Sequence, residues 1–85
     1  MYDYEDYIHF VSKLTHANEM YLNKNTGEMG EHEIHKGNCT FLPDPENREY
    51  LGENITFTQA TRIAHAKGYK KVDGCYYCNR QNHVI

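Results

Sequence analysis

The stretches HKGNC at residues 35–39 and CYYC at residues 75–78 decide how this chain of 85 residues folds. The first places a histidine four positions before a cysteine, and the second brings in the other two cysteines of the sequence. Thiolate sulfur and imidazole nitrogen are the ligands that a tetrahedral zinc ion prefers, and two short-spaced pairs let two chain turns hold one ion. The spacing therefore predicts one structural zinc ion bound by His35, Cys39, Cys75 and Cys78.

The three cysteines also allow other interpretations. Two could form a disulfide beside a free thiol, the C-x2-C pair could be a redox motif, or all three could be buried apolar side chains. A redox motif would be expected in a βαβ setting, which the sequence lacks, and an odd number of cysteines disfavours a secreted disulfide framework. We therefore expect a cytoplasmic protein whose thiols stay reduced and available to metal.

Size and composition favour one small domain over residues 1–85 that a metal ion helps to stabilise. A chain of this length buries only about 60 to 65% of its unfolded surface, and eight tyrosines contribute to its 39% hydrophobic content. Tyrosine hydroxyls need polar partners, so the aliphatic core is thin. Zinc binding adds directly to the folding free energy when the unfolded chain has no such site.

Several classes of function are disfavoured. No apolar run reaches the roughly 18 residues that cross a bilayer, and the first six residues, MYDYED, are acidic where a signal peptide is basic. The net charge of −3 gives no general attraction to nucleic acid. We find neither a nucleophile with its base nor a glycine loop for phosphate, so no small-molecule substrate and no enzyme activity are expected.

The fold class predicted from the pattern is α+β, with an amino-terminal helix, a hairpin or a short sheet of three strands, and one packed helix. Apolar steps predict a helix over residues 2–16 within an extension over 1–18. Residues 20–23 and 28–35 flank the turn sequence 24–27, in which Gly27 can take a positive φ, and so predict a hairpin that delivers His35. Residues 41–54 predict a loop and then a short strand or turn at 50–51.

The packed helix is expected from Phe57 to about Lys67. Thr56 and Gln59 have the spacing of a capping box, and Gly68 can end the helix in a left-handed conformation. A short extended piece over 69–72 then leads to the second ligand pair. The buried face of the helix is predicted to consist of Phe57, Ala60, Ile63, Ala64 and Ala66.

The order of hairpin, ligand-x3-Cys, loop, helix, Gly-aromatic and Cys-x2-Cys resembles the zinc-binding domain at the amino end of the Ada DNA-repair protein and its small bacterial and phage relatives. The matching stretches lie within residues 19–80: NTG at 25–27, HKGNC at 35–39, residues 60–69, and CYYC at 75–78. In Ada-like domains the first ligand is a cysteine that accepts a methyl group from DNA, whereas this chain has His35 there. Metal-bound imidazole offers no sulfur for alkylation, so the resemblance implies the fold and the zinc site without methyl transfer.

DNA binding by Ada-like domains depends on basic residues around the site. A nucleic-acid-binding module is therefore an alternative function, although lysines at the end of a helix are equally expected from its dipole. The candidate residues are Arg62, Lys67, Lys70, Lys71 and Arg80.

Other histidines offer alternative chemistry. His32 or His83 could replace His35 as a ligand, although H-x3-C suits a tight turn better than H-x6-C. The pair Asn82-His83 suggests an HNH-type nuclease, but the catalytic metal of a nuclease needs an oxygen-rich site that the sequence lacks. His9, His16 and His65 are expected at the surface of helices.

The function expected is therefore that of a non-catalytic binding module with one structural zinc, because four protein ligands leave no open position on the ion. Its partner is an unidentified protein or nucleic acid. Exposed aromatic side chains are candidates for a protein interface, namely Tyr2, Tyr4, Tyr7, Tyr76 and Tyr77.

Overall fold

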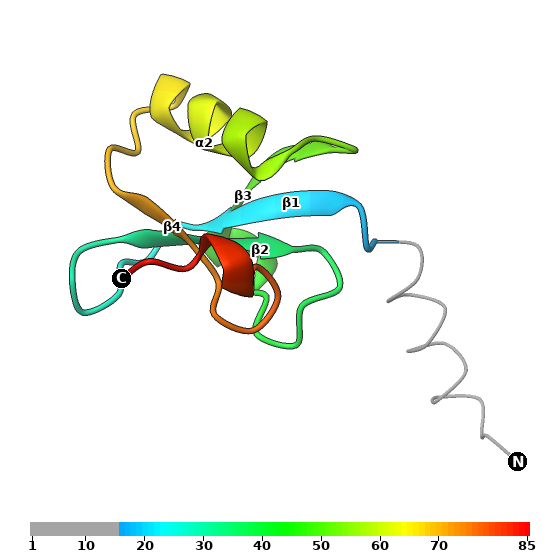
Figure 1. Cartoon of the computed structure of the whole chain (residues 1–85), viewed down its shortest axis with the longest axis horizontal. Coiled ribbons are helices and arrows are strands. Elements are labelled where there is room, and N and C mark those ends of the chain that lie inside the picture. Colours follow the sequence, from blue (N-terminus) through cyan, green and yellow to red (C-terminus); the bar gives the residue numbers. More distant parts are fainter. Residues whose placement is uncertain (1–15) are drawn as a thin grey trace, which may run out of the picture.

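A computed structural model describes residues 16–85 of the chain. In this part, an α-helix lies over one face of a four-stranded sheet (Figure 1). The elements are β1 (Glu19–Asn23), β2 (His32–Lys36), the 3-10 helix η1 (Pro45–Asn47), β3 (Arg48–Glu53), α2 (Phe57–Ala66), β4 (Val72–Gly74) and the 3-10 helix η2 (Arg80–Asn82). The α+β class is thus confirmed for these residues. The amino-terminal helix predicted over 2–16 lies mainly outside the described residues, as does His9.

The strands follow the order β3-β1-β2-β4 across the sheet. Strand β1 pairs antiparallel with both β2 and β3, whereas β2 and β4 are parallel. The hairpin predicted before His35 is therefore confirmed, with Tyr21 opposite His35 and Leu22 opposite Ile34. The sheet has one strand more than the largest sheet predicted, because β4 adds to the free edge of β2.

The hairpin loop differs from the predicted turn. It runs from residue 24 to residue 31, and the amide of Gly27 donates to the carbonyl of Glu31 over 2.8 Å. Gly30 has the positive φ, at 79°, so the positive φ predicted for Gly27 is wrong. Gly27 instead allows close approach, because a Cβ there would overlap the carboxylate of Glu31.

The core lies between the sheet and α2. Leucine and isoleucine side chains of the sheet meet two alanines of the helix, and the fully or nearly fully buried set is Leu22, Ile34, Leu51, Ala60 and Ala64. Phe57 and Ile63 pack against this set from the same helix face, as predicted. Ala66 is exposed, so its assignment to the buried face is wrong, because two residues advance about 200° around a helix and Ala66 therefore faces away from the side of Ala64.

Both ends of α2 follow the local signals. The side chain of Thr56 accepts from the amide of Gln59, and the side chain of Gln59 accepts from the amide of Thr56, which completes the capping box. Gly68 has a φ of 100°, and the amide of Tyr69 donates to the carbonyl of Ala64 over 3.0 Å, as in a Schellman cap. The described part of the chain contains no helix whose length and hydropathy would let it span a bilayer.

Candidate metal centre

The four predicted zinc ligands lie together on the side of the sheet away from α2. His35 is in β2, Cys39 follows the next turn, and Cys75 and Cys78 belong to the turn after β4. No two of their ligand atoms are more than 4.8 Å apart. Two chain segments separated by more than thirty residues in sequence thus converge on one point, as the motif spacing predicts.

Backbone pairing brings these segments together. The parallel register places Ile34 beside Gly74, and the amide of Cys75 donates to the carbonyl of Ile34 over 3.0 Å. The residues that follow, His35 in β2 and Cys75 directly after the end of β4, are therefore neighbours. Hydrogen bonds from the amide of Cys39 to Lys36 and from the amide of Asn79 to Cys75 close the two ligand turns.

The sulfur positions suit a metal ion and not a disulfide. The Sγ atoms of Cys39 and Cys75 lie 3.9 Å apart, and all three cysteines are free thiols. A disulfide requires about 2.05 Å between sulfurs. Tetrahedral zinc with Zn–S bonds of about 2.3 Å places two sulfurs about 3.8 Å apart. The observed separation therefore agrees with shared coordination of one ion.

The imidazole of His35 provides the second test of fit. The residue is only 4% exposed, yet neither Nδ1 nor Nε2 has a hydrogen-bond partner. A buried polar atom without a partner is unfavourable by about 1–3 kcal/mol, and a metal ion would satisfy one of the two nitrogens. Burial lowers the pKa of His35, which favours the neutral imidazole that binds metals.

Each ligand sulfur also accepts a backbone amide. Lys36 donates to Cys78 over 3.2 Å, and Phe41 and Tyr77 donate over 3.4 Å to Cys39 and Cys75. Such amides stabilise thiolates around a bound metal. In the protein without metal, the effect of burial outweighs that of these amides and raises the pKa of Cys39 and Cys78. Redox-active cysteines have a lowered pKa, so the redox interpretation of C-x2-C is disfavoured.

Two buried residues support the second ligand turn, and neither was predicted to do so. Asn79 is 1% exposed and donates from Nδ2 to the carbonyl of Ile34 over 3.0 Å. Asp73, buried beside Gly74, accepts from the amide of Val84 over 2.8 Å and lies 2.8 Å from Nδ1 of His83. Polar residues flanking a C-x2-C pair are the only signal in the sequence that could have indicated this support.

The alternative histidine ligands lie away from the centre. His32 points to the other face of the sheet, where its Nδ1 donates to the carbonyl of Asn23 and its ring contacts Tyr69. Nδ1 of His83 is engaged with Asp73 and with the carbonyl of Gly74. His16 and His65 are exposed. Among the described histidines, His35 alone joins the cluster.

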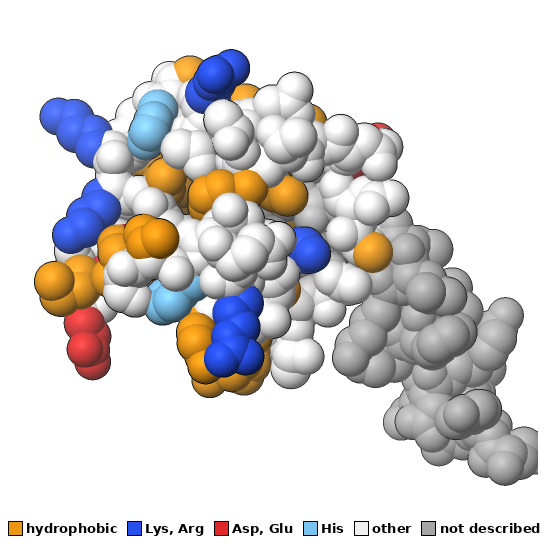
Figure 2. All heavy atoms as spheres, in the orientation of Figure 1, with side chains coloured by type: hydrophobic (Ala, Val, Ile, Leu, Met, Phe, Trp, Pro, Cys, Tyr) orange, Lys and Arg blue, Asp and Glu red, His pale blue; other side chains and the backbone are white. Residues whose placement is uncertain are grey.

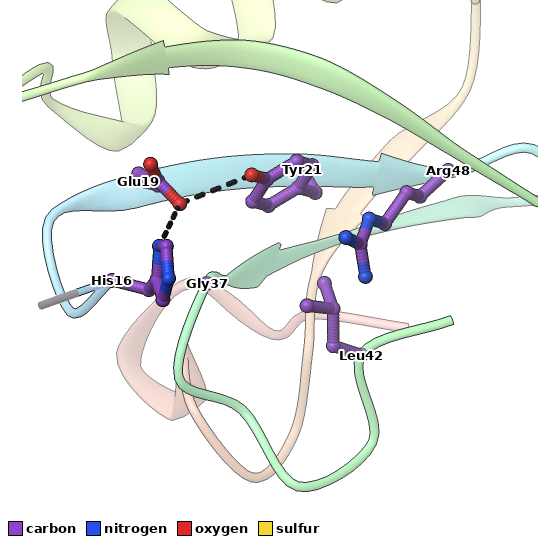
Figure 3. Close-up of a pocket in the computed structure, with 6 residues that line it drawn as sticks. All are labelled: His16, Glu19, Tyr21, Gly37, Leu42 and Arg48. Carbon is purple, nitrogen blue, oxygen red and sulfur yellow. Dashed lines mark hydrogen bonds and ion pairs between the residues drawn. The ribbon is translucent and has the colours of Figure 1, made fainter. Parts of the chain in front are cut away.

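A pocket of about 230 Å³ lies beside the first ligand turn, and Figure 3 shows its lining. Glu19 accepts from the hydroxyl of Tyr21 over 3.0 Å and lies 2.8 Å from Nδ1 of His16. The guanidinium of Arg48 covers the ring of Tyr21 and donates to the carbonyl of Pro43. Burial and the charge of Glu19 raise the pKa of Tyr21, which keeps its hydroxyl protonated. The polar groups of the lining are thus engaged in contacts within the protein, and we assign these contacts a structural role beside the ligand turn.

The five basic residues predicted to contact nucleic acid have different surroundings. Nζ of Lys67 pairs with Glu49 over 3.2 Å, and Lys71 donates to the carbonyl of Met29. Arg80 lies over the ring of Tyr76, next to the ligand Cys75. Arg62 and Lys70 are exposed. Their role in nucleic-acid binding stays a prediction.

Comparison of the chain with protein-family models, with curated proteins and with solved structures gives no match.

Proposed function

We propose that this protein is a small, non-catalytic binding module whose fold is held together by one structural zinc ion. His35, Cys39, Cys75 and Cys78 would supply all four ligands. Three thiolates and an imidazole form a donor set that suits zinc, whereas magnesium and calcium prefer oxygen. With four protein ligands the ion has no open position for water, which supports a structural role.

One observation carries this proposal: the buried imidazole of His35, with both nitrogens unpartnered, lies within 4.8 Å of three free thiols. A purely structural histidine at 4% exposure would be expected to hydrogen-bond. Three thiols gathered by chance would not each receive a backbone amide. A bound cation accounts for all of these features together.

The small apolar core explains why a bound ion would be needed to stabilise the fold. The buried hydrophobic side chains between sheet and helix are two leucines, one isoleucine and two alanines in the described part of the chain. A metal site joins the end of the β1–β2 hairpin to the turn after β4, which a small apolar core would hold weakly. The module is then expected to unfold at least in part when the metal is removed.

The order of the ligands also supports our proposal of kinship with Ada-like zinc domains. In that kinship His35 stands where the methyl-accepting cysteine would be, so the centre would keep the structural role and lack the transfer reaction. Cytoplasmic location is part of the same proposal, since free thiols persist in a reducing compartment.

Metal analysis of protein purified without chelator tests the proposal. One zinc per chain is expected for the natural sequence and for His65→Ala, a control that changes an exposed histidine outside the cluster. Cys75→Ser and His35→Ala should retain far less zinc and melt at lower temperature. The proposal fails if no stoichiometric transition metal is found, or if Cys75→Ser changes neither metal content nor melting.

A further inference from the structure

Three aromatic side chains are exposed directly over the candidate metal centre. Phe41 is 54% exposed, Tyr76 44% and Tyr77 68%. Phe41 comes two residues after Cys39, and the two tyrosines lie between Cys75 and Cys78. Large apolar side chains exposed as a group usually mark a binding surface. We therefore call Phe41, Tyr76 and Tyr77 the aromatic platform and expect it to bind a ligand.

The rings of the platform are ordered among themselves. Phe41 and Tyr77 stack with centroids 4.3 Å apart and an angle of 29° between the rings, and Tyr76 meets Tyr77 edge to face. The guanidinium of Arg80 lies 4.8 Å from the centroid of Tyr76. Flat rings with an adjacent cation are thus grouped together, and each of the three residues stays between 44% and 68% exposed.

The two segments that carry the platform contain basic but no acidic side chains, although Glu33 and Asp44 directly flank the first of them. Residues 34–43 and 74–85 carry Lys36 and Arg80 but no aspartate or glutamate, although the chain has twelve acidic residues and a net charge of −3. Asp73, which precedes the second segment, is buried and bound by the carboxyl-terminal residues. In Figure 2 hydrophobic side chains gather beside a basic one at the lower edge of the view, where Figure 1 places the two ligand turns.

We propose that the platform binds single-stranded nucleic acid, with unpaired bases stacked on Phe41, Tyr76 and Tyr77 and a phosphate contacted by Arg80. A single strand combines the two properties that this surface selects, planar apolar faces and negative charge. In a duplex the faces of the bases are covered by their neighbours, so duplex binding would not use the exposed rings. This proposal rests on the proposed zinc module and identifies its ligand.

The metal couples to this surface through the chain itself. The amide of Phe41 donates to Cys39 and the amide of Tyr77 to Cys75, so the sulfurs position the backbone beneath both rings. Without the ion, the turns that carry Phe41 and Tyr77 lose their common anchor. Binding of a single strand to the platform is therefore expected to require zinc. A purely electrostatic contact through lysines elsewhere on the protein would not require it.

The aromatic platform is separate from the basic residues near α2. Lys and Arg side chains lie over the helix and the loop that follows it, at the upper left of Figure 2. Of these, Lys70 is exposed and has no aromatic neighbour among the described ring contacts. Lys70→Ala is thus a matched control for Arg80→Ala, because each removes one exposed cation but only one removes it from the platform.

Fluorescence anisotropy with labelled oligothymidylate and oligouridylate of about 12 nucleotides, at low salt, measures the binding. The zinc-loaded full chain should bind both strands more tightly than a duplex of equal length. Tyr77→Ala should weaken binding roughly 5- to 150-fold, the range for loss of one stacked base, whereas Tyr77→Phe should retain it. Arg80→Ala should reduce the salt slope by about 0.7, and Lys70→Ala should leave both the slope and the affinity nearly unchanged.

Zinc content and melting of the same samples separate the two proposals. A folded protein with one zinc per chain that binds no single strand at low salt overturns this inference and leaves the zinc module standing. Equal affinity for duplex and single strand would also overturn it, as would an unchanged affinity in Tyr77→Ala. The inference is likewise overturned if the protein binds no strand and instead forms a concentration-dependent dimer that Tyr77→Ala abolishes. Loss of binding on chelation, restored by added zinc, would support it.

Discussion

Gly74 is a position in the second ligand turn where the structure predicts a large effect of adding a single methyl group. An ideal Cβ at Gly74 would lie 2.8 Å from the carbonyl oxygen of Asn79, 2.9 Å from Cβ of Asn82 and 3.0 Å from its carbonyl carbon. Ordinary contacts of a Cβ begin near 3.4 Å. Gly74→Ala must therefore push the Asn79–Asn82 backbone away by about half an ångström, and overpacking of this kind costs about 1–3 kcal/mol.

The displacement would also reach the metal centre, because Asn79 directly follows the ligand Cys78. For a domain of this size, about 2 kcal/mol lowers the melting temperature by roughly 8–16 °C. Thermal unfolding followed by circular dichroism measures this loss. The absorption spectrum of the cobalt-substituted protein should change as well, since it reports the arrangement of the four ligands.

Gly68→Ala serves as the control for this substitution. No atom lies within 4 Å of a Cβ at Gly68, but its φ of 100° strains any residue with a side chain, at about 1–2 kcal/mol. We expect Gly68→Ala to lower the melting temperature without altering the cobalt spectrum. If Gly74→Ala melts like the natural protein and gives the same spectrum, the described packing of the second ligand turn is incorrect.

Three further predictions concern other parts of the molecule. Thr56→Ala removes the capping box of α2 and should destabilise the zinc-loaded protein by about 1 kcal/mol in chemical denaturation, whereas Thr58→Ala, at an exposed helix position, should have little effect. Asp73→Asn weakens acceptance from the amide of Val84 and the contact with His83, so hydrogen exchange at Val84 should accelerate while that of Leu22 stays slow. Because burial raises the pKa of Cys39 and Cys78, these two thiols are protonated at pH 7 and zinc must displace their protons. The apparent zinc affinity should therefore rise with pH, and calorimetry in buffers of different ionisation enthalpy should detect at least about two protons released per ion. An affinity that stays constant between pH 6 and pH 8 would contradict thiolate coordination.

Local signals were sufficient for the parts of the structure that depend on neighbours in sequence. The Thr56–Gln59 box and Gly68 locate the helix to within one residue of its observed end, since capping involves only the adjacent amides. The ligand spacing predicts which four side chains converge, because each pair closes its own short turn. The hairpin could be predicted for the same reason, because its two strands are close in sequence.

Features that arise from distant pairing could not be predicted. The extended piece expected over 69–72 becomes strand β4 over Val72–Gly74, because parallel pairing with β2 brings Val72 onto the core and buries Asp73. A buried aspartate contradicts the local pattern, and only the tail residues that bind it explain its position.

Zinc-edge X-ray absorption of the purified, unreconstituted protein tests the central claim most directly. The four-ligand centre predicts three sulfur neighbours at about 2.3 Å and one nitrogen at about 2.0–2.1 Å. His35→Ala should remove the nitrogen shell, whereas His32→Ala, which changes a histidine on the opposite face of the sheet, should leave the spectrum intact. A first shell made only of nitrogen and oxygen, or an unchanged spectrum in His35→Ala, would contradict the account.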